Sequence, residues 1–373
     1  MTSSPLPRRT LLAWTGAAGL GGLMAPPLAA RPRHRQAAAK ATADTPAAAA
    51  SGQAYGLRDD VRRLAAGLAG QHGIDAEWAQ ATLAQARFVP AVARLIMPPP
   101  KGSVKNWAAY RARFIEPERI RAGAAFWAAN AAWLATAEDV FGVPPEAVVG
   151  IIGVETFYGR VMGNFRVLDA LATLSLDFPT GRSDRSGFFQ QQLGEFLVWV
   201  QREKRDPLAI KGSFAGAVGL GQFMPGSINQ FAVDFDGDGR IDLANSAADA
   251  IGSVARYLKA HGWRSAEPTH FSVEPPADMA ERALLLAPDI LPSFDRGQMQ
   301  QHGARLPEAA RDYEGLLALV ELQNGGGAPT YVAGTQNFYA ITRYNWSAYY
   351  AMAVIELGAA IAAERAKAVK TAR

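Results

Sequence analysis

Residues 148–160 of the chain read VVGIIGVETFYGR, and a single acid, Glu155, follows seven residues that are apolar or glycine. Two prolines and a glutamate at 144–146 precede the run, and proline is common in the first turn of a helix. This pattern predicts an apolar helix over 147–156 that carries Glu155 near its end. Ionising a carboxylate in such surroundings is costly, so its pKa rises and it stays protonated near neutral pH, as a general acid must.

The same segment also allows a structural interpretation of Glu155. Many buried glutamates are merely paired with an arginine, and Arg160 and Arg166 follow closely. Gly150 and Gly153 lie inside the expected helix, where each glycine costs about 1 kcal/mol relative to alanine. We therefore expect another backbone or a ligand to come close to this helix. The spacing alone leaves both interpretations of the glutamate open.

A second informative stretch, residues 211–225, reads KGSFAGAVGLGQFMP. It lacks the Gly-Lys-Ser/Thr ending of a phosphate loop, and no strong strand precedes it as in a dinucleotide fingerprint. Its small residues would let the backbone approach a sugar chain. Ser213 and Gln222 offer hydrogen bonds to amide and hydroxyl groups. A tight packing loop without a ligand is the alternative.

Residues 234–242, DFDGDGRID, match the first nine positions of an EF-hand calcium loop. Acids occupy positions 1, 3 and 5, and a glycine at position 6 allows the sharp turn. Position 12 is Asn245 instead of the usual glutamate, but an aspartate four residues further on would close a longer loop. A solvated acidic turn is the alternative. The predicted ligands are Asp234, Asp236, Asp238, the Arg240 carbonyl and Asp249.

Charge and cysteine content exclude several classes of protein. The 373 residues carry a formal net charge of +4, but the first 40 hold six basic residues and no acid, which leaves 32 basic against 34 acidic residues in the rest. A non-specific nucleic-acid binder needs a concentrated basic surface, which this near-neutral body does not supply. The chain has no cysteine, which excludes a disulfide framework, a thiol nucleophile, a cysteine zinc site and a lipidated cysteine.

The first 30 residues predict a signal peptide. The basic pair Arg8 and Arg9 precedes an apolar stretch over 11–24, and LAA at 28–30 fits a cleavage site. The apolar run is too short and glycine-rich for a membrane span. The TLL after the arginine pair resembles a twin-arginine signal, with an ordinary secretory signal or a cytoplasmic location as alternatives. We expect a periplasmic protein with a flexible Ala- and Pro-rich tether over 31–53.

Apolar residues at three- and four-residue spacings predict helices through most of the chain. Residues 264–334 differ, because short β-like pieces separated by proline and glycine predict a small mixed α/β insertion there. Helices are expected within 57–97, 117–140, 147–156, 188–202, 247–261 and 347–366, and strands at 269–273, 316–322 and 330–332.

A series of motifs occurs in a fixed order along residues 57–366. They are GVPP at 142–145, IIGVET at 151–156, GRVMG at 159–163, LDALATL at 168–174, GSFAGA at 212–217, GQFMP at 221–225, the acidic loop, NFY at 337–339 and TRYN at 342–345. In these motifs the chain resembles the B-type lytic murein transglycosylases of glycoside hydrolase family 103.

The resemblance implies a mainly α (α+β) fold, with a lysozyme-like helical core, an additional helical domain and a small β-containing insertion. It also implies Glu155 as the single catalytic residue, a structural calcium ion in the acidic loop and a sugar-binding groove. The polar loop 180–187 is longer than the family pattern, so Arg182 and Arg185 are alternatives for one contact. The implied groove residues are Tyr110, Arg182, Ser213, Gln222, Phe223, Tyr257, Tyr344, Asn345 and Tyr350. The expected divisions after the tether are 54–140 (N-terminal helical domain), 141–263 (catalytic core), 264–334 (insertion) and 335–373 (C-terminal helical part).

The implied activity is non-hydrolytic cleavage of the β-1,4 bond between N-acetylmuramic acid and N-acetylglucosamine in peptidoglycan, by a monomer without a catalytic cofactor. Most glycosidases need two carboxylates, and Asp169 and Asp177 are possible second acids, although the resemblance gives neither that role. One carboxylate suffices if the substrate supplies its own N-acetyl group and C6 hydroxyl. A hydrolytic muramidase, a non-catalytic wall-binding protein and a calcium sensor are the alternatives.

Overall fold

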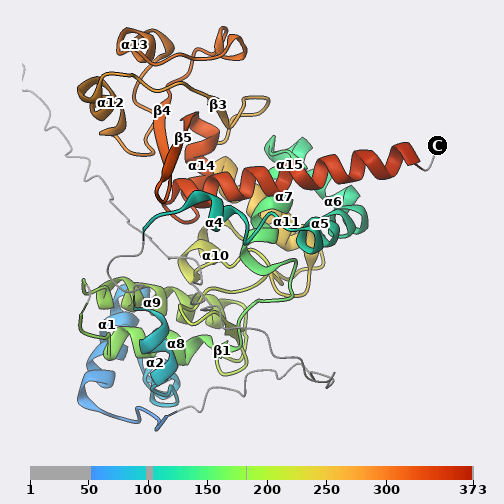
Figure 1. The fold of residues 1–373 in the computed structure, drawn as a ribbon. Coiled ribbons are helices and arrows are strands. Elements are labelled where there is room, and N and C mark those ends of the chain that lie inside the picture. The colour runs from blue at the N-terminus through green and yellow to red at the C-terminus, as the bar shows by residue number, and fades with distance from the viewer. Residues whose placement is uncertain (1–51, 98–103, 182, 372–373) are drawn as a thin grey trace, which may run out of the picture.

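The computed structural model describes residues 52–97, 104–181 and 183–371. The predicted signal peptide and nearly all of the predicted tether lie outside these residues. Figure 1 shows a lower group of helices, a central group around α15 and an upper part that holds the larger of two small antiparallel sheets. The mainly helical, lysozyme-like fold with a small β-containing part is therefore confirmed.

The lower group of helices joins segments that lie far apart in the sequence. The Tyr55 hydroxyl donates a hydrogen bond of 2.5 Å to Asp177, and the backbone N–H of Val89 donates to the Thr173 hydroxyl over 3.0 Å. These bonds attach the N-terminal segment to the helix that follows the glutamate-bearing region. The members of this group are α1 (Asp59–His72), α2 (Ala76–Ala84), α3 (Pro90–Leu95), α8 (Val167–Leu176) and α9 (Ser186–Arg202).

The central group contains α7 (Pro145–Thr156) and the long helix α15 (Ala348–Thr371), which pack against each other. Helix α7 begins with a proline in its first turn, as predicted, and buries eight of its twelve residues. Because nearly every side of α7 is covered, it forms the centre of the main hydrophobic core. The other helices here are α4 (Trp107–Arg111), α5 (Pro117–Ala129), α6 (Ala131–Phe141), α10 (Pro225–Phe231), α11 (Ala247–Ala260) and α14 (Gln336–Thr342).

Glycines allow α7 and α15 to touch backbone to backbone. A Cβ atom on Gly150 would lie 2.4 Å from the carbonyl oxygen of Val354. A Cβ atom on Gly358 would lie 2.2 Å from the carbonyl oxygen of Glu146. Both distances are far shorter than a van der Waals contact, so neither position accepts a side chain without movement of the helices. The close approach expected from the glycines of α7 is thus made by α15.

The upper part of the molecule has its own small core. Its sheet has the order β3-β5-β4 and is antiparallel throughout, with Val320 of β4 opposite Val332 of β5. Its elements are β3 (His270–Ser272), α12 (Met279–Leu286), α13 (Arg296–Gln301), the short 3-10 helix η1 (Glu308–Ala310), β4 (Ala318–Asn324) and β5 (Gly327–Gly334). Its core residues are Phe271, Leu285, Met299, Ala304, Ala310, Leu317, Leu319 and Ala333.

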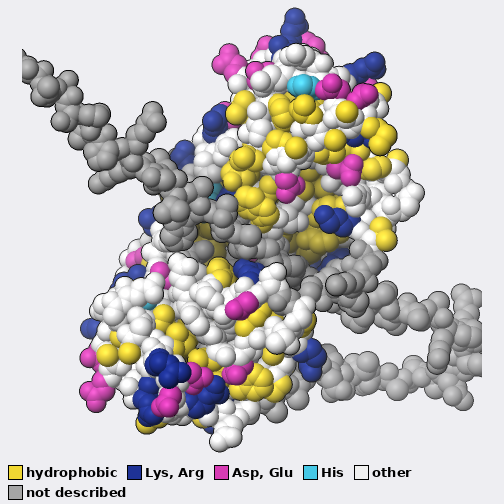
Figure 2. All heavy atoms as spheres, turned by 90° about the vertical axis from the view of Figure 1, so that its left-hand side faces the viewer, with side chains coloured by type: hydrophobic (Ala, Val, Ile, Leu, Met, Phe, Trp, Pro, Cys, Tyr) yellow, Lys and Arg dark blue, Asp and Glu magenta, His cyan; other side chains and the backbone are white. Residues whose placement is uncertain are grey.

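The surface carries charges of both signs. On the face drawn in Figure 2, acidic and basic side chains are interspersed, and hydrophobic side chains gather around the hollow between the upper and lower parts. This mixture agrees with the near-neutral charge of the chain after its first 40 residues. Within the described ranges, no helix combines the length and the apolar character needed to cross a membrane.

The contact between α7 and α15 makes a testable prediction about Gly150. We expect Gly150→Ala to lower the free energy of unfolding by about 1–3 kcal/mol, because the new methyl group overlaps the Val354 carbonyl oxygen. In the control, Gly70→Ala on α1, the added Cβ meets nothing within 4 Å and should raise the stability by about 0.5–1 kcal/mol. Urea unfolding measures both; equal stabilities would contradict the backbone contact.

Candidate active site and acidic loop

An abrupt turn ends helix α7 after Thr156, the residue that follows Glu155. Phe157 and Tyr158 have φ angles of 51° and 57°, a left-handed conformation that residues other than glycine seldom adopt. The Thr156 hydroxyl donates a hydrogen bond of 2.9 Å to the carbonyl oxygen of Leu220, in the glycine-rich segment. Glu155 therefore lies in the last turn of α7, where this helix meets residues 211–225.

The carboxyl group of Glu155 is half-buried and accepts a hydrogen bond from α15. The Tyr350 hydroxyl donates to Oε1 of Glu155 over 2.6 Å, and Tyr350 itself is only 1% exposed. Burial raises the pKa of Glu155 to about 7, although the Tyr350 hydrogen bond acts in the opposite direction. The site therefore contains an acid that is protonated and ionised in similar amounts near neutral pH.

The structural interpretation of Glu155, in which it pairs with a nearby arginine, is wrong. Arg160 donates instead to Glu118 over 2.6 Å, and Arg166 pairs with Asp169 over 2.6 Å. Burial raises the pKa of Glu155, and neither arginine forms an ion pair that would lower it again.

The two possible second acids are committed to the lower group of helices. Asp169 is buried, where it accepts hydrogen bonds from Arg166 and from the backbone N–H of Arg87. Asp177 accepts the Tyr55 hydroxyl over 2.5 Å. Both carboxylates therefore join α8 to the N-terminal segment, and neither is paired with Glu155.

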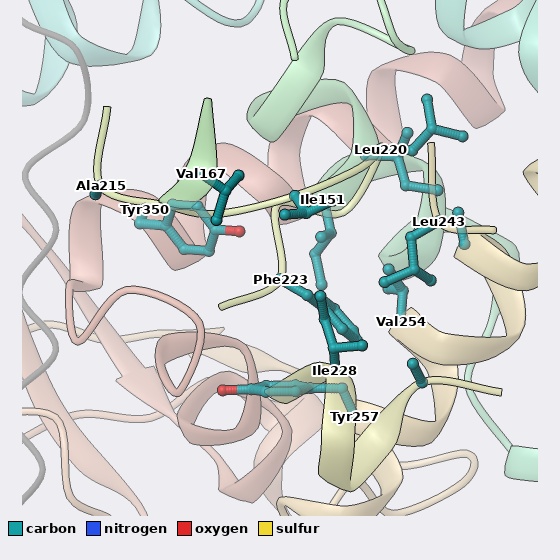
Figure 3. Close-up of a cluster of buried hydrophobic side chains, with 14 of the residues drawn as sticks. Ile151, Val167, Ala215, Leu220, Phe223, Ile228, Leu243, Val254, Tyr257 and Tyr350 are labelled. Carbon is teal, nitrogen blue, oxygen red and sulfur yellow. The ribbon is translucent and has the colours of Figure 1, made fainter. Parts of the chain in front are cut away.

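Aromatic rings from separate segments pack together beside Glu155. The ring centroid of Tyr344 lies 4.4 Å from that of Tyr257 and 6.4 Å from that of Tyr350. Phe223 lies between Ile151 and Tyr257 in Figure 3, with its ring 5.7 Å from Tyr257. Burial, then the neighbouring Tyr257 and Glu155, raise the pKa of Tyr344 well above 10.

Phe223 and Tyr257 are buried members of this aromatic cluster. They are 2% and 8% exposed, and the Tyr257 hydroxyl donates over 2.8 Å to the backbone carbonyl of Arg343. Their rings are covered by protein, and both pack against the ring of Tyr344. Together with Tyr350, they are the implied groove residues that offer the least surface to a ligand.

Helix α4 brings Tyr110 to the same place from another direction. Burial raises the pKa of Tyr110 to about 12, and the charge of Glu155 contributes to that rise against the effect of Arg113. An electrostatic effect of this kind requires proximity. The Tyr110 ring packs edge-on against Tyr349 of α15 at 5.9 Å, next to the residue that donates to Glu155.

Ser213 and Gln222 are partly engaged by their own loop. Ser213 Oγ accepts hydrogen bonds of 3.3 and 3.0 Å from two backbone N–H groups of the segment. The side-chain amide of Gln222 donates to the carbonyl oxygens of Met162 and Gly219. The serine hydroxyl therefore still has its hydrogen to donate, and the glutamine keeps its carbonyl oxygen to accept.

The remaining implied groove residues are placed differently. Asn345 lies in the turn between α14 and α15, directly after Tyr344. Arg182 lies outside the described residues. The alternative at that loop, Arg185, has its guanidinium over the ring of Phe188 at 4.7 Å. The structure thus brings Tyr110, Tyr257, Tyr344 and Tyr350 close to Glu155 and packs Phe223 against two of these rings. Ser213 and Gln222 lie in the same glycine-rich segment as Phe223, and Asn345 follows Tyr344.

The acidic loop brings three carboxylates together. Asp234, Asp236 and Asp249 each place one oxygen within 4.8 Å of the others. Asp249 lies in the first turn of α11 and accepts hydrogen bonds of 2.8 and 2.7 Å from the backbone N–H groups of Phe235 and Asp242. Asp249 thus closes the loop in place of the usual acid at position 12, which is Asn245 in this chain. Three carboxylate oxygens at this spacing suit a hard cation such as calcium.

Asp238 and Arg240 occupy the turn of the same loop. The Asp238 carboxylate accepts a hydrogen bond of 2.8 Å from the backbone N–H of Arg240. Burial raises the pKa of Asp249, and Asp236 adds to the rise through its charge. A divalent cation among these groups would remove that repulsion.

Arg119 of α5 is not among the residues predicted for the site. Its guanidinium donates over 2.6 Å to the carbonyl oxygen of Gly153 and stacks 4.2 Å from the ring of Phe157. Arg160 lies against the same ring at 4.5 Å. Phe157 is therefore clamped in its left-handed conformation two residues after Glu155. No local pattern around Arg119 indicates this contact, because it joins two helices.

Comparison with known proteins adds a family to this geometry. The Transglycosylase SLT domain family matches residues 57–359. The chain is 43% identical over 309 residues to the membrane-bound lytic murein transglycosylase B of Escherichia coli (strain K12), which covers 79% of this chain and 80% of that protein.

Solved structures of similar proteins include one with calcium and one with a peptidoglycan fragment. The Escherichia coli lytic transglycosylase SLT35 in complex with calcium superimposes with a TM-score of 0.71 at 40% identity, over 85% of this chain and 96% of that one. SltB3 from Pseudomonas aeruginosa in complex with NAG-anhNAM-pentapeptide gives a TM-score of 0.66 at 32% identity, over 82% of this chain and 79% of that one.

The hydrogen bond from Tyr350 makes a prediction about the titration of Glu155. Tyr350→Phe removes a donor that favours the ionised carboxylate, so the pKa of Glu155 should rise above its value of about 7. In the control, Tyr331→Phe removes a bond of the same 2.6 Å length to Glu321 in the upper part and should leave Glu155 unchanged. Carbon-13 NMR of labelled glutamate carboxyls, assigned with Glu155→Gln, measures the shift; a fall in pKa would contradict it.

Proposed function

Since the chain belongs to the Transglycosylase SLT domain family, we propose that Glu155 is the only acid and base with which it cleaves peptidoglycan glycan strands. As a member of this family the chain is a peptidoglycan lytic transglycosylase, a lyase. The bond in question is the β-1,4 link between N-acetylmuramic acid and N-acetylglucosamine. The observation that carries the proposal is the half-buried carboxyl of Glu155, with a pKa of about 7 and a hydrogen bond from Tyr350.

The first step of the reaction is the transfer of a proton. With Oε1 engaged by Tyr350, the proton of neutral Glu155 is best placed on Oε2. That proton passes to the glycosidic oxygen as the bond from this oxygen to the muramic acid C1 breaks, and the leaving sugar departs with a new hydroxyl group. The cationic C1 is stabilised by the substrate's own N-acetyl group, so no second carboxylate is required.

The second step returns the enzyme to its starting state. The ionised Glu155 takes the proton from the C6 hydroxyl of the muramic acid, and the C6 oxygen closes on C1 to form the 1,6-anhydro ring. Water is not consumed, and Glu155 is again neutral. A pKa of about 7 suits both steps, because the group must give up a proton and regain one in a single cycle. The internal hydroxyl reacts faster than water because its effective molarity is about 10⁵ M or more.

Ser213 and Gln222 have the free groups needed to orient an N-acetyl substituent. The hydrogen of the Ser213 hydroxyl can be donated to the acetamido carbonyl, and the Gln222 carbonyl oxygen can accept its N–H. Tyr110 and Tyr344 offer ring surface beside Glu155, whereas Phe223 and Tyr257 lie below them. Asn345 adds an amide at the rim, and Arg182 stays a prediction for the neighbouring loop.

We propose that calcium binds to the acidic loop and stabilises the fold. Asp234, Asp236 and Asp249 supply the carboxylates, and Asp238 and the Arg240 carbonyl complete the predicted ligand set. Because Asp249 lies on α11 and also bonds to Asp242, the ion would connect the loop to that helix. The loop carboxylates accept hydrogen bonds from backbone groups of the loop itself, so the role that we propose for the ion is structural.

We also propose a periplasmic location, reached by export on the predicted signal peptide over residues 1–30. Peptidoglycan lies outside the cytoplasmic membrane, so the substrate requires export. The twin-arginine form of the signal stays a prediction, as does a monomeric state. The body of the chain is near neutral, which fits a glycan partner and gives no reason to expect nucleic acid.

Replacement of Glu155 tests the catalytic proposal. Glu155→Gln keeps the shape and the acceptor for Tyr350 but removes the titratable proton, so cleavage should fall by at least about 100-fold. Binding to sacculi should persist. Glu314→Gln, which changes an exposed glutamate of the upper part, should retain full activity. Mass spectrometry of digested sacculi reads the products, and reducing ends in place of anhydro ends would indicate a hydrolytic muramidase.

Calcium should raise the melting temperature of the protein. An ion that binds only the folded state stabilises it by about 2.7 kcal/mol at a concentration of 100 times its Kd. A chelator should reverse the shift, and Asp249→Asn should abolish it. Asp139→Asn, on exposed helix surface, should keep the full response. Melting curves that do not respond to calcium or chelator in the wild type would exclude a working ion site.

A further inference from the structure

The turn between α14 and α15 exposes a tryptophan beside the active site. Trp346 is 39% exposed and has a φ of 31°, in the left-handed region. It lies two residues after Tyr344 and four before Tyr350, which donates to Glu155. A left-handed conformation at a residue other than glycine costs free energy, and such positions cluster at functional sites.

Two neighbouring side chains fix the indole in place. The guanidinium carbon of Arg343 lies 4.7 Å from the Trp346 ring centroid and 5.6 Å from that of Tyr339. The Tyr339 and Trp346 rings meet nearly edge-on, with centroids 6.2 Å apart and planes at 78°. The backbone carbonyl of Arg343 accepts the Tyr257 hydroxyl over 2.8 Å, so this group is connected to the aromatic cluster beneath Tyr344.

The arrangement places an indole that is both ordered and accessible at the rim of the site. An exposed tryptophan on a mobile loop would lose conformational entropy when a ligand ordered it. Trp346 has already lost that freedom through Arg343 and Tyr339. The flat apolar face of an indole matches the C–H face of a pyranose ring, and the adjacent guanidinium can donate to a sugar hydroxyl or carboxylate.

We propose that Trp346, Tyr339 and Arg343 form a distal saccharide subsite, in which Trp346 stacks on a sugar ring of the same glycan strand that Glu155 cleaves. The proposal rests on the proposed function, because it takes a glycan strand as the ligand. Trp346 follows Tyr344 and Asn345 in the same turn, and Arg343, which lies over its ring, accepts the Tyr257 hydroxyl at its carbonyl. A strand that extends from Glu155 across Tyr344 can therefore continue onto the indole. The subsite therefore increases affinity for long strands without taking part in the proton transfers.

In this role Trp346 affects the binding of long strands but not the chemical step. A short oligosaccharide that fills only the sugars around Glu155 does not reach the indole, whereas a longer one does. Loss of the stacking contact should therefore raise KM for long strands and leave kcat unchanged for short ones. An aromatic replacement preserves a flat apolar face and should preserve most of the effect.

The test uses binding and turnover of peptidoglycan oligosaccharides of two lengths, a tetrasaccharide and an octasaccharide. In a Glu155→Gln background, calorimetry should show that Trp346→Ala weakens octasaccharide binding about tenfold and tetrasaccharide binding less than twofold. Trp346→Phe should recover most of the affinity. Met279→Ala, which removes an 80% exposed side chain from α12, is the control and should match the parent for both ligands.

The outcomes separate this inference from the proposed function. Equal weakening for both lengths, or none for either, would overturn the distal subsite while leaving the catalytic proposal intact. A failure of Trp346→Phe to recover binding would also overturn it, because stacking requires only the aromatic face. If the parent protein neither binds nor cleaves either oligosaccharide, the proposed function itself fails. Circular dichroism of Trp346→Ala should match the parent, which excludes loss of the fold as the cause.

Discussion

The hydrogen bond between Tyr350 and Glu155 is the interaction on which the rest of the site depends. It joins α7 to α15 across a buried surface, and the two helices come close enough only because glycines replace side chains at Gly150 and Gly358. The same burial that raises the pKa of Glu155 would leave the carboxyl without a polar partner if α15 moved away. Helix packing, polarity and proton affinity at this position therefore depend on one another, and in this chain two glycines and the Tyr350 hydroxyl satisfy all three.

Much of the fold and the raised pKa of Glu155 can be predicted from the sequence, because the information is local. One carboxylate in an apolar run predicts a raised pKa, and prolines mark the start of α7 where the structure has it. Periodicity also finds α9, α11 and the strands of the upper part to within a few residues. These features depend on residues that are neighbours in the chain, so they are readable without knowing the tertiary contacts.

The remaining features require contacts between distant segments. The left-handed turn at Phe157 depends on Arg119 from α5, and the closure of the acidic loop depends on Asp249 in a helix that begins later. Sequence spacing also left open whether an arginine neutralises Glu155; only the folded structure shows that Arg160 and Arg166 are paired elsewhere. Phe223 is covered by protein and packs against Tyr344. Which aromatic residues are covered follows from packing and not from residue type.

The two partners of the central hydrogen bond are separated by 195 positions in the chain, and the upper sheet with its own core is encoded between them. During synthesis the acid leaves the ribosome long before the tyrosine that orients it, so a nascent or prematurely terminated chain has the carboxyl without its donor. The proposed reactive centre is therefore completed only when the last helix, α15, is present. A chain truncated before α15 therefore lacks both the hydroxyl that bonds to Glu155 and the helix that packs on α7.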